Sequence, residues 1–442
     1  MGNCRFCGNH LNHTFIDLGN QPPSNSFLTK EQLDLPEIYY PLRVYVCERC
    51  FLVQLPEVKK ASEIFKDDYV YYSSESPANV AHAKEYVKMI INRFNPLHVL
   101  EIGSNDGYML QWFKEKGCDV LGVDPADGPA TIAIKKKDIP TFRFFFGIDL
   151  CNKTFIKDTK FDLICSINTI AHQPDINDFV AGIKIALAPN GVTTHEFPHL
   201  MNLVEKCQFD TIYHEHYSYF SFITICLIFE KHGLEIFDVE QIPEHGGSLR
   251  IYAQHEKTGK YPVNVRVPRL FEEEYEKGMD TLAYYQGFQG EIDKIKRDII
   301  RLLNPSPLFI IDPDAFSKNF DLGVIRPRKI WITKEIKPPT IIYTHNKIAA
   351  YGAAAKGVTF LNYCGIRSDL ISFVVDRSPH KIGKYLPGSH IPVVSEDVLK
   401  EQKPAYVLIL AWNLKNEIME QLKYIREWNG IFIVAAPKLE VL

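Results

Sequence analysis

A glycine-rich turn between a predicted strand and a predicted helix constrains the fold of this chain more than any other feature. Residues 97–101 form a short apolar strand that ends in Glu101, and the turn 103–107 leads into a helical segment over 108–116. The glycines let the backbone approach a ligand closely, and the start of the helix offers free N–H groups. Asp124 ends the next predicted strand, where an acid can accept hydrogen bonds from a ribose diol. The pattern predicts a nucleotide-binding β-α-β unit.

Strands and helices alternate on both sides of this unit. We predict strands over 119–123, 141–146 and 161–166 and helices over 85–94, 129–137 and 179–187. This alternation is typical of a mostly parallel, doubly wound sheet. A charged helical stretch over 267–303 and a proline-rich, irregular stretch over 304–345 follow. The alternation then resumes with strands over 348–351, 371–375 and 406–410, which predicts a second, smaller α/β domain.

Length, charge and the lack of long apolar runs limit the class of function. A chain of 442 residues needs two or three cores. Its net charge of -4 argues against a dedicated nucleic-acid binder. No apolar run reaches the about 20 residues that span a bilayer, and the N-terminus lacks the layout of a secretory signal. We expect a cytoplasmic monomer with no nucleic-acid or membrane partner.

Four of the ten cysteines form two C-x-x-C pairs, Cys4 with Cys7 and Cys47 with Cys50. Each pair can supply two thiolates from one tight turn, and two such turns make a tetrahedral zinc site. A redox pair is the alternative reading. Because all four ligands would be cysteines, the metal would have no open coordination position and would stabilise the N-terminal domain rather than catalyse. The other six cysteines are expected to be free thiols in a reducing compartment.

The spacing of the glycine turn distinguishes between two nucleotide cofactors. A dinucleotide fold prefers G-x-G-x-x-G, whereas Gly103 and Gly107 are four residues apart and follow Glu101. Glu101 would repel a pyrophosphate and would favour an ammonium or sulfonium group. S-adenosylmethionine is therefore favoured over NAD; an ordinary β-α turn without a ligand is the alternative. We expect the cofactor to contact Glu101, Gly103, Ser104, Asn105, Asp106, Gly107, Asp124 and Asn168.

Histidines and tyrosines are concentrated in residues 209–217, which end in Tyr213-His214-Glu215-His216-Tyr217. The spacing is not H-E-x-x-H and no third ligand is evident, so metal catalysis is a poor reading. A histidine beside a glutamate and tyrosines suits proton abstraction and stabilisation of an enolate oxygen. Tyr71, in a tyrosine-rich segment upstream, and His172 are further candidates. Any one of these histidines alone is more often a structural residue.

The ordered set of motifs resembles the sugar C-methyltransferases, notably the C-3 methyltransferases of nucleotide-linked 4-keto-deoxyhexoses. The resemblance covers nearly the whole chain. Besides the cysteine quartet it is carried by D-Y-V-Y-Y-S-S (68–74), L-E-I-G-S-N-D-G (100–107), E-F-P (196–198), Q-F-D-T-I-Y-H-E-H (208–216), H-G-G-S-L-R (245–250) and Y-G-A-A-A-K-G (351–357). Ala350 and Ala354 stand where the family has glycine and proline, and the stretch 304–345 has no counterpart in the family pattern.

The resemblance implies a zinc-binding domain (1–70), a Rossmann-type methyltransferase domain (71–256), a connection (257–346) and a C-terminal Rossmann-like domain (347–442) that binds the sugar nucleotide. It implies that His216 is the base, supported by Glu215, and that Tyr213, Tyr71 and His172 line the same pocket. His214 and His172 remain competing bases. Lys356, Lys381 and Lys384 would complement a pyrophosphate, and the motifs add Tyr351 and Arg250 as substrate-binding residues.

The implied reaction begins at a carbon acid. A C4 ketone acidifies the neighbouring C3–H, the base removes that proton, and the enolate carbon receives a methyl group. Two other functions stay open from the residues alone. One is an O- or N-methyltransferase with the same cofactor fold, and the other is a zinc-ribbon binding protein with an inactive methyltransferase fold.

Overall fold

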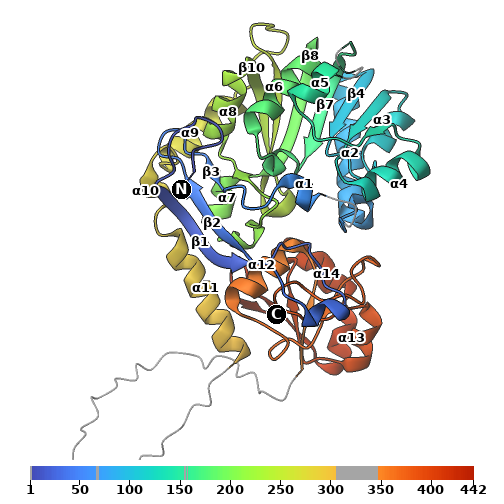
Figure 1. Cartoon of the computed structure of the whole chain (residues 1–442), viewed down its shortest axis with the longest axis vertical. Helices are drawn as coiled ribbons and strands as arrows, with labels where there is room; N and C mark the ends of the chain where they lie inside the picture. The colour runs from blue at the N-terminus through green and yellow to red at the C-terminus, as the bar shows by residue number, and fades with distance from the viewer. Residues whose placement is uncertain (1, 66–68, 154–155, 157, 305–346) are drawn as a thin grey trace, which may run out of the picture.

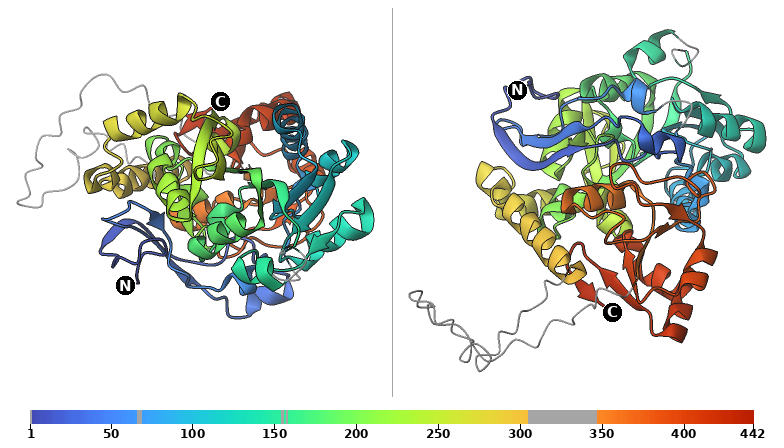
Figure 2. Two further views of the ribbon diagram at one scale, coloured as in Figure 1. Left: turned by 90° about the horizontal axis from the view of Figure 1, so that it is seen from above. Right: turned by 60° about the horizontal axis from the view of Figure 1, so that its bottom comes forward.

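A computed structural model describes residues 2–65, 69–153, 156, 158–304 and 347–442, and Figure 1 shows its three sheets with their helices. The methyltransferase-like sheet and the C-terminal sheet form opposite ends of the molecule, and the N-terminal strands lie along one side between them (Figure 2). The predicted α/β class, with a small N-terminal domain and two Rossmann-like parts, is confirmed. Asp68 and nearly all of the stretch 304–345 lie outside the described residues.

The N-terminal sheet is antiparallel and has the order β1-β2-β3-β9. Its strands are β1 (His13–Gln21), β2 (Tyr40–Val46), β3 (Val53–Gln54) and β9 (Ser218–Tyr219), and the short helices nearby are η1 (Glu31–Asp34), α1 (Ala61–Ile64) and η2 (Ser73–Glu75). Buried Leu42 and Val44 flank the exposed Arg43 along β2, as expected where a sheet is covered on one face. The fourth strand comes from far along the chain, so this sheet is completed by the segment that follows His216.

The central sheet has the order β10-β11-β8-β7-β4-β5-β6. Its strands are β4 (His98–Ile102), β5 (Asp119–Val123), β6 (Thr141–Phe142), β7 (Phe161–Ile167), β8 (Leu187–Pro198), β10 (Leu234–Ile242) and β11 (Ser248–His255). Strands β4 to β8 pair in parallel, whereas β11 is antiparallel to both of its neighbours. The chain leaves β4 toward β5 on one side and reaches β7 on the other, so the carboxyl ends of β4 and β7 flank a topological switch point.

Helices cover both faces of the central sheet. The helices along this part of the chain are α2 (Pro77–Phe94), α3 (Leu110–Glu115), α4 (Asp127–Lys137), α5 (Ile148–Lys153), η4 (Ile170–His172), α6 (Ile176–Ala186), α7 (Leu200–Glu205), η5 (Phe209–Thr211), α8 (Phe222–Lys231) and η6 (Glu244–Gly246). Local sequence sets their starts: the side chains of Ser76, Asp175 and Ser221 cap α2, α6 and α8 by accepting backbone N–H groups. The predicted strand over 141–146 is shorter than expected, and Phe144 and Phe145 are exposed beyond its end.

The predicted helical stretch 267–303 consists of α9 (Arg266–Glu276), α10 (Leu282–Tyr285) and α11 (Phe288–Leu303). Gly278 and Gly287 separate them, with φ of +77° and +86°, which a glycine adopts without strain.

The C-terminal sheet has the strand order β14-β13-β12-β15-β16-β17. It contains β12 (Ile348–Tyr351), β13 (Val374–Val375), β14 (Val393–Val394), β15 (Tyr406–Ile409), β16 (Ile431–Val434) and β17 (Glu440–Val441), with α12 (Ala355–Cys364), α13 (Glu396–Gln402), η7 (Trp412–Leu414), α14 (Lys415–Gln421) and η8 (Lys423–Trp428).

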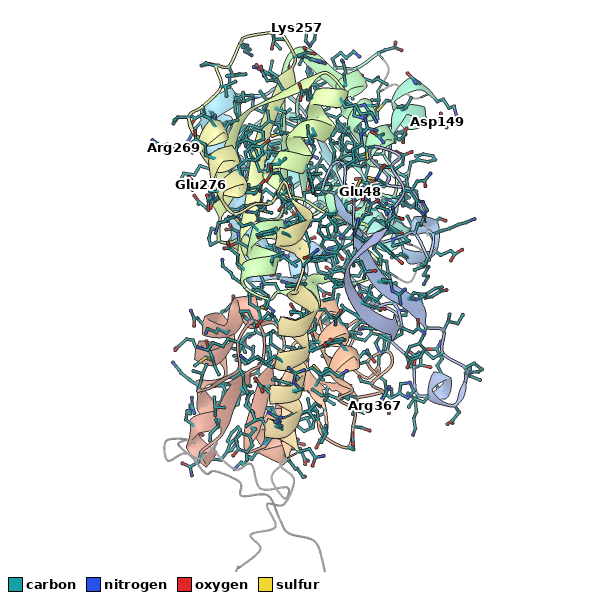
Figure 3. The ribbon with its side chains drawn as sticks, turned by 90° about the vertical axis from the view of Figure 1, so that its left-hand side faces the viewer. Glu48, Asp149, Lys257, Arg269, Glu276 and Arg367 are labelled. Carbon is teal, nitrogen blue, oxygen red and sulfur yellow. The ribbon has the colours of Figure 1, made fainter. Side chains whose placement is uncertain are left out.

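One apolar core crosses the predicted domain boundaries. It joins Phe15 and Val44 of the N-terminal sheet to Phe288 and Ile292 of α11 and to Leu361 of α12. Figure 3 shows α11 running along the side of the C-terminal domain and up to the N-terminal sheet. The N-terminal and C-terminal parts therefore bury apolar surface against each other. Among the described helices, none combines the length and the apolar character that a membrane crossing needs.

Candidate functional site

The four predicted zinc ligands converge at one end of the N-terminal sheet. Their sulfur atoms all lie within 4.8 Å of one another, with Cys4 and Cys50 3.6 Å apart and Cys7 and Cys47 3.5 Å apart. A tetrahedral zinc with sulfur at about 2.3 Å needs sulfur atoms about 3.8 Å apart. The side chain of Gln54 donates to Cys4 Sγ (3.1 Å), as a neighbour of a thiolate ligand does. The set therefore fits a closed, structural zinc site.

Arg5, inside the first cysteine turn, connects this metal site to the central domain. Its peptide N–H donates to Gln54 (2.9 Å), and its guanidinium donates to the carbonyl of Pro174 (2.8 Å). The same guanidinium lies 5.3 Å from the centre of the Tyr217 ring. Burial lowers the pKa of Arg5 to about 10, so the group stays charged at neutral pH. The cysteine turn is thus fixed against Pro174, two residues after His172, and against Tyr217, which directly follows His216.

The predicted glycine turn forms at the carboxyl end of β4. The N–H of Gly103 donates to the carbonyl of Val123 (2.7 Å), and the N–H of Asn105 donates to Asp124 (2.8 Å), whose other oxygen accepts from Ala126 (2.9 Å). Gly103 has φ of +73°, and a Cβ atom there would lie 2.2 Å from Thr169 Oγ1. The position therefore requires glycine, and Asp124 holds the turn in shape.

Several acceptors around this turn are buried without a hydrogen bond to any described residue, although Asp106 Oδ1 lies 3.7 Å from the ammonium of Lys137. They belong to the side chains of Glu101, Ser104, Asp106 and Asn168. Burial, and then the charges of Asp124 and Asp106, raise the pKa of Glu101 well above its usual value. Unpaired buried acceptors with carboxylates among them suit a ligand that carries a positive charge and hydrogen-bond donors. The residues present therefore fit S-adenosylmethionine.

The segment containing Tyr71 packs against the same turn. The N–H of Ser73 donates to the side chain of Asn105 (2.8 Å), which in turn donates to the carbonyl of Tyr71 (3.1 Å). The N–H of Ser74 donates to Asp106 (3.2 Å). The Tyr71 ring is 40% exposed, so it remains accessible to a second ligand beside the cofactor turn.

His216 is buried in a stack of rings. Its Nδ1–H donates to the carbonyl of Thr211 (2.8 Å), which leaves the lone pair on Nε2 without a hydrogen bond within the described part of the chain. The ring centre lies 4.1 Å from that of Tyr213 and 4.9 Å from that of His172. Burial, and then the charge of His172, lower the pKa of His216 well below its usual value. The free protein therefore holds a neutral imidazole with one defined tautomer.

Glu215 faces other residues than the imidazole of His216. Its oxygens accept from Asn25 (2.6 Å) and Tyr69 (3.4 Å), and Thr211 takes the position that Glu215 was expected to fill beside His216. Burial raises the pKa of Glu215 to about 7. Burial and the nearby Glu215 carboxylate raise the pKa of Tyr213 well above 10, so its hydroxyl stays protonated. Catalytic support by Glu215 stays a prediction.

The structure separates the two competing bases. His214 points to β2, where its Nε2 makes a hydrogen bond to the carbonyl of Tyr40 (3.3 Å), and burial lowers its pKa to about 4. His172 lies in the ring stack, with Nε2 buried and unpartnered among the described residues, and burial lowers its pKa to about 4. The stack therefore contains His172 and His216 but not His214.

The predicted substrate lysines differ in their surroundings. The ammonium of Lys356 is buried without a hydrogen bond to any described residue, 4.8 Å from the centre of the Trp412 ring, and burial lowers its pKa. The indole N–H of Trp412 donates to Asp210 (2.6 Å), and the negative charge of Asp210 partly counteracts the effect of burial on the pKa of Lys356. Lys381 donates to the carbonyl of Ala353 (2.9 Å), and Lys384 is half-exposed. Of the three, Lys356 is the one with a buried charge that lacks a hydrogen bond.

Tyr351 and Arg250 already have side-chain partners. The hydroxyl of Tyr351 accepts from Gln421 (2.6 Å) at the C-terminal sheet. Arg250 donates to Glu196 (2.6 Å) and Glu240 (2.9 Å) within the central sheet. Among the described residues, neither side chain is hydrogen-bonded to one of the three lysines, and a role of Tyr351 and Arg250 in substrate binding stays a prediction. Sequence reasoning did not single out Asn25 or Trp412, whose side chains donate to Glu215 and Asp210, and it noted Asp210 and Thr211 only as part of the segment 209–217.

Three family models match the chain in order: a zinc binding domain over residues 4–65, a methyltransferase domain over residues 79–239, and a C-methyltransferase C-terminal domain over residues 243–306 and 341–437. The chain is 31% identical, over 442 residues, to the C-methyltransferase NovU of Streptomyces niveus, which covers 99% of this chain and 96% of that protein. A ubiquinone biosynthesis O-methyltransferase of Bartonella quintana is 25% identical over 26% of this chain and 50% of its own length. The solved structure of PH0226 protein from Pyrococcus horikoshii OT3 covers 42% of this chain and 95% of its own, at 14% identity and a TM-score of 0.36.

Replacing Cys47 by serine should abolish metal binding and unfold the N-terminal sheet, because structural zinc contributes on the order of 10 kcal/mol to such domains. Elemental analysis should find about one zinc per wild-type chain and none in the variant. Cys207→Ser is the matched control, since this half-buried thiol lies outside the quartet. Wild-type protein prepared with zinc under reducing conditions but free of metal would contradict the assignment.

Asp124→Ala should weaken S-adenosylmethionine binding by roughly 1.5–3 kcal/mol, at least about tenfold, because a charge-assisted hydrogen bond is lost. Calorimetric titration measures the affinity. Asp119→Ala is the control, since Asp119 begins the same strand and its side chain is 85% exposed. Wild-type affinity in Asp124→Ala, or binding of NAD in place of S-adenosylmethionine by the native chain, would refute this cofactor site.

Proposed function

The chain belongs to the C-methyltransferase family, and on that premise we propose that it methylates C3 of a nucleotide-linked 4-keto-deoxysugar. It is an S-adenosylmethionine-dependent C-methyltransferase with a zinc-binding domain. The full-length likeness to NovU carries the proposal, because it extends over the C-terminal domain as well as the methyltransferase domain. The matched O-methyltransferases cover about a quarter of this chain and so support only the shared cofactor fold.

His216 is the base in this proposal. Its Nδ1–H is committed to Thr211, so Nε2 carries the lone pair that takes the C3 proton. A neutral imidazole is required at the start of the step, and burial keeps His216 in that form. His172, which lacks the bond that fixes the tautomer of His216, is the competing base. S-adenosylmethionine supplies the electrophilic methyl group that the resulting carbanion takes.

Tyrosines would stabilise the charge that develops on the C4 oxygen. Tyr213 packs on His216, and its hydroxyl stays protonated because its pKa is raised well above 10 by burial. Such a hydroxyl can donate to an enolate oxygen. Tyr71 is held beside the cofactor turn by Asn105 and can donate from the other side. An O-methyltransferase would need a base but no donor to an enolate.

The nucleotide part of the substrate would lie on the C-terminal domain, residues 347–442. Lys356 is the second residue of helix α12, which follows the glycine and alanine turn, and its ammonium has no hydrogen-bonding partner within the described residues. A diphosphate would provide that partner and would benefit from the free N–H groups at the start of the helix. Lys381 supports the turn through Ala353, and Lys384 would act from the surface.

His216→Asn should lose methylation and solvent exchange of the C3 hydrogen together, by roughly 10²–10⁴-fold, while S-adenosylmethionine affinity is kept. Exchange in deuterium oxide, followed by mass spectrometry on a panel of nucleotide-linked 4-keto sugars, isolates proton removal from methyl transfer. His214→Asn is the matched control, because its ring bonds to β2 outside the ring stack. Exchange at the wild-type rate in His216→Asn would assign the base to another residue, and no product from any sugar would favour an inactive binding protein.

Lys356→Met should raise the KM for the sugar nucleotide about tenfold or more, since a charge-assisted contact to a diphosphate is lost while the side-chain volume is nearly kept. The affinity for S-adenosylmethionine should not change. Lys384→Met, which removes a half-exposed charge, is the control and should stay within about twofold of wild type. Equal KM values in the two variants would exclude Lys356 from the diphosphate site.

A further inference from the structure

The connection between β1 and β2, residues 22–39, reaches across to the C-terminal domain, and we name it the strap. Leu28 exchanges two backbone hydrogen bonds with Tyr385 (3.0 and 2.8 Å). Near the other end of the strap, Glu37 accepts from the N–H of Gly388 (2.8 Å) and contacts His390 (3.0 Å). Figure 3 labels Arg367, beside which the strap lies on the C-terminal domain. The strap is therefore fixed at two points to the domain that would hold the sugar nucleotide.

Between these anchors and the zinc site, the strap presents Asn25 to the buried carboxyl group of Glu215. The amide Nδ2 donates to Glu215 Oε1 at 2.6 Å, whereas Tyr69 reaches the other oxygen at 3.4 Å. Glu215 is 3% exposed, so water does not substitute for these donors. A hydrogen bond to an ionised, buried carboxylate is worth more than one at the surface. Asn25 is thus the main hydrogen-bond donor to Glu215 within the described residues.

Two neutral tyrosines and two lysines act on Glu215. Tyr69 and Tyr213 lie close enough for the carboxylate to raise their pKa values, and Lys59 and Lys381 favour the ionised carboxylate. Lys381 lies 5.6 Å from the centre of the Phe27 ring in the strap and donates to Ala353. The strap and the C-terminal domain therefore act on the same carboxylate from adjacent positions.

We propose that Asn25 is a positioning residue of the active site and that it acts through Glu215. Through Asn25, binding of the strap to the C-terminal domain would favour the ionised form of the Glu215 carboxylate. The inference rests on the proposed function. The oxygens of Glu215 face Asn25 and Tyr69, but Glu215 directly precedes His216 in the chain, so its negative charge would favour the imidazolium that His216 becomes when it accepts the C3 proton. Without the donor, the buried carboxylate would take up a proton at a higher pH and lose this effect.

Asn25→Ala should raise the pKa of Glu215 from about 7 by about one pH unit, because the hydrogen bond that stabilises the ionised form is lost. Activity that requires ionised Glu215 falls as the pH drops through this pKa, so the acidic limb of the kcat/KM profile should move to higher pH. Infrared difference spectra of the full chain, with the Glu215 signal identified by its loss in Glu215→Gln, measure the same titration without substrate. Asn25→Asp keeps the volume of the side chain but replaces the N–H donor with a carboxylate, so it should also raise the pKa of Glu215.

Two controls separate positioning from a structural effect. Asn20→Ala removes an exposed amide from β1 and should leave the titration unchanged. In a Glu215→Gln background, Asn25→Ala should cause no further shift of the pH profile, because its effect passes through the carboxylate. An unshifted infrared titration in both Asn25 variants, or an additive effect in the double variant, would overturn the proposal. The infrared result decides it even where wild-type protein fails to methylate any keto sugar, an outcome that would count against the proposed function alone.

Discussion

The pairing of β3 with β9 is the interaction on which the candidate active site depends. Val53 pairs with Tyr219 and Gln54 with Ser218, and the N–H of Leu55 donates to the carbonyl of Tyr217 (3.0 Å). On the other side, the N–H of Tyr217 donates to Ala171 (2.8 Å), next to His172. The segment with His216 is thus held between the zinc-binding sheet and the carboxyl end of β7. Because the Cys47–Cys50 turn leads directly into β3, a structural metal there would also hold the strand that pairs with the segment after His216.

Burial determines the chemistry available at this site. Burial lowers the pKa values of His216 and His172, so both stay neutral, and it raises the pKa of Glu215 to about 7. Within the described residues, one oxygen each of Glu101 and Asp106 is buried without a hydrogen bond. Each of these groups costs folding free energy that a fully paired core would not. A hydrogen bond lowers this cost where it does not block the site. The carbonyl of Thr211 accepts from Nδ1 of His216, whereas Nε2 keeps its lone pair for a ligand. The unsatisfied atoms of Glu101, Ser104, Asn168 and His172 belong to the glycine turn, its surroundings and the ring stack, which indicates a site shaped for ligands rather than a defect of packing.

Sequence reasoning succeeded where the signal is local. The turn 103–107 and Asp124 lie within one β-α-β unit, and the spacing of the cysteines alone selects a four-thiolate site. It failed where contacts join distant segments. Nothing near Asn25 indicates that its amide meets Glu215, and β9 is two residues long, too short for any periodicity to reveal. Arg250 has the composition of an anion-binding residue, but pairing with Glu196 and Glu240 depends on the register of β11 with β8 and β10. Only the folded chain sets these distances.

In both Rossmann-like parts, an aspartate after a strand accepts two backbone N–H groups, but the side chains around the two turns carry opposite charges. In the central domain, Asp124 accepts N–H groups from the glycine turn and from the residue two positions after itself (2.8 and 2.9 Å). In the C-terminal domain, Asp376 directly follows β13 and accepts from the N–H groups of Ala353 (2.7 Å) and Ser378 (2.9 Å) in the same pattern. The first turn has the carboxylates of Glu101 and Asp106 around it, whereas the second leads into the buried ammonium of Lys356. Since the backbone is shared, the side-chain charge distinguishes the ligands: a sulfonium cofactor suits the first turn, and the diphosphate proposed above suits the second.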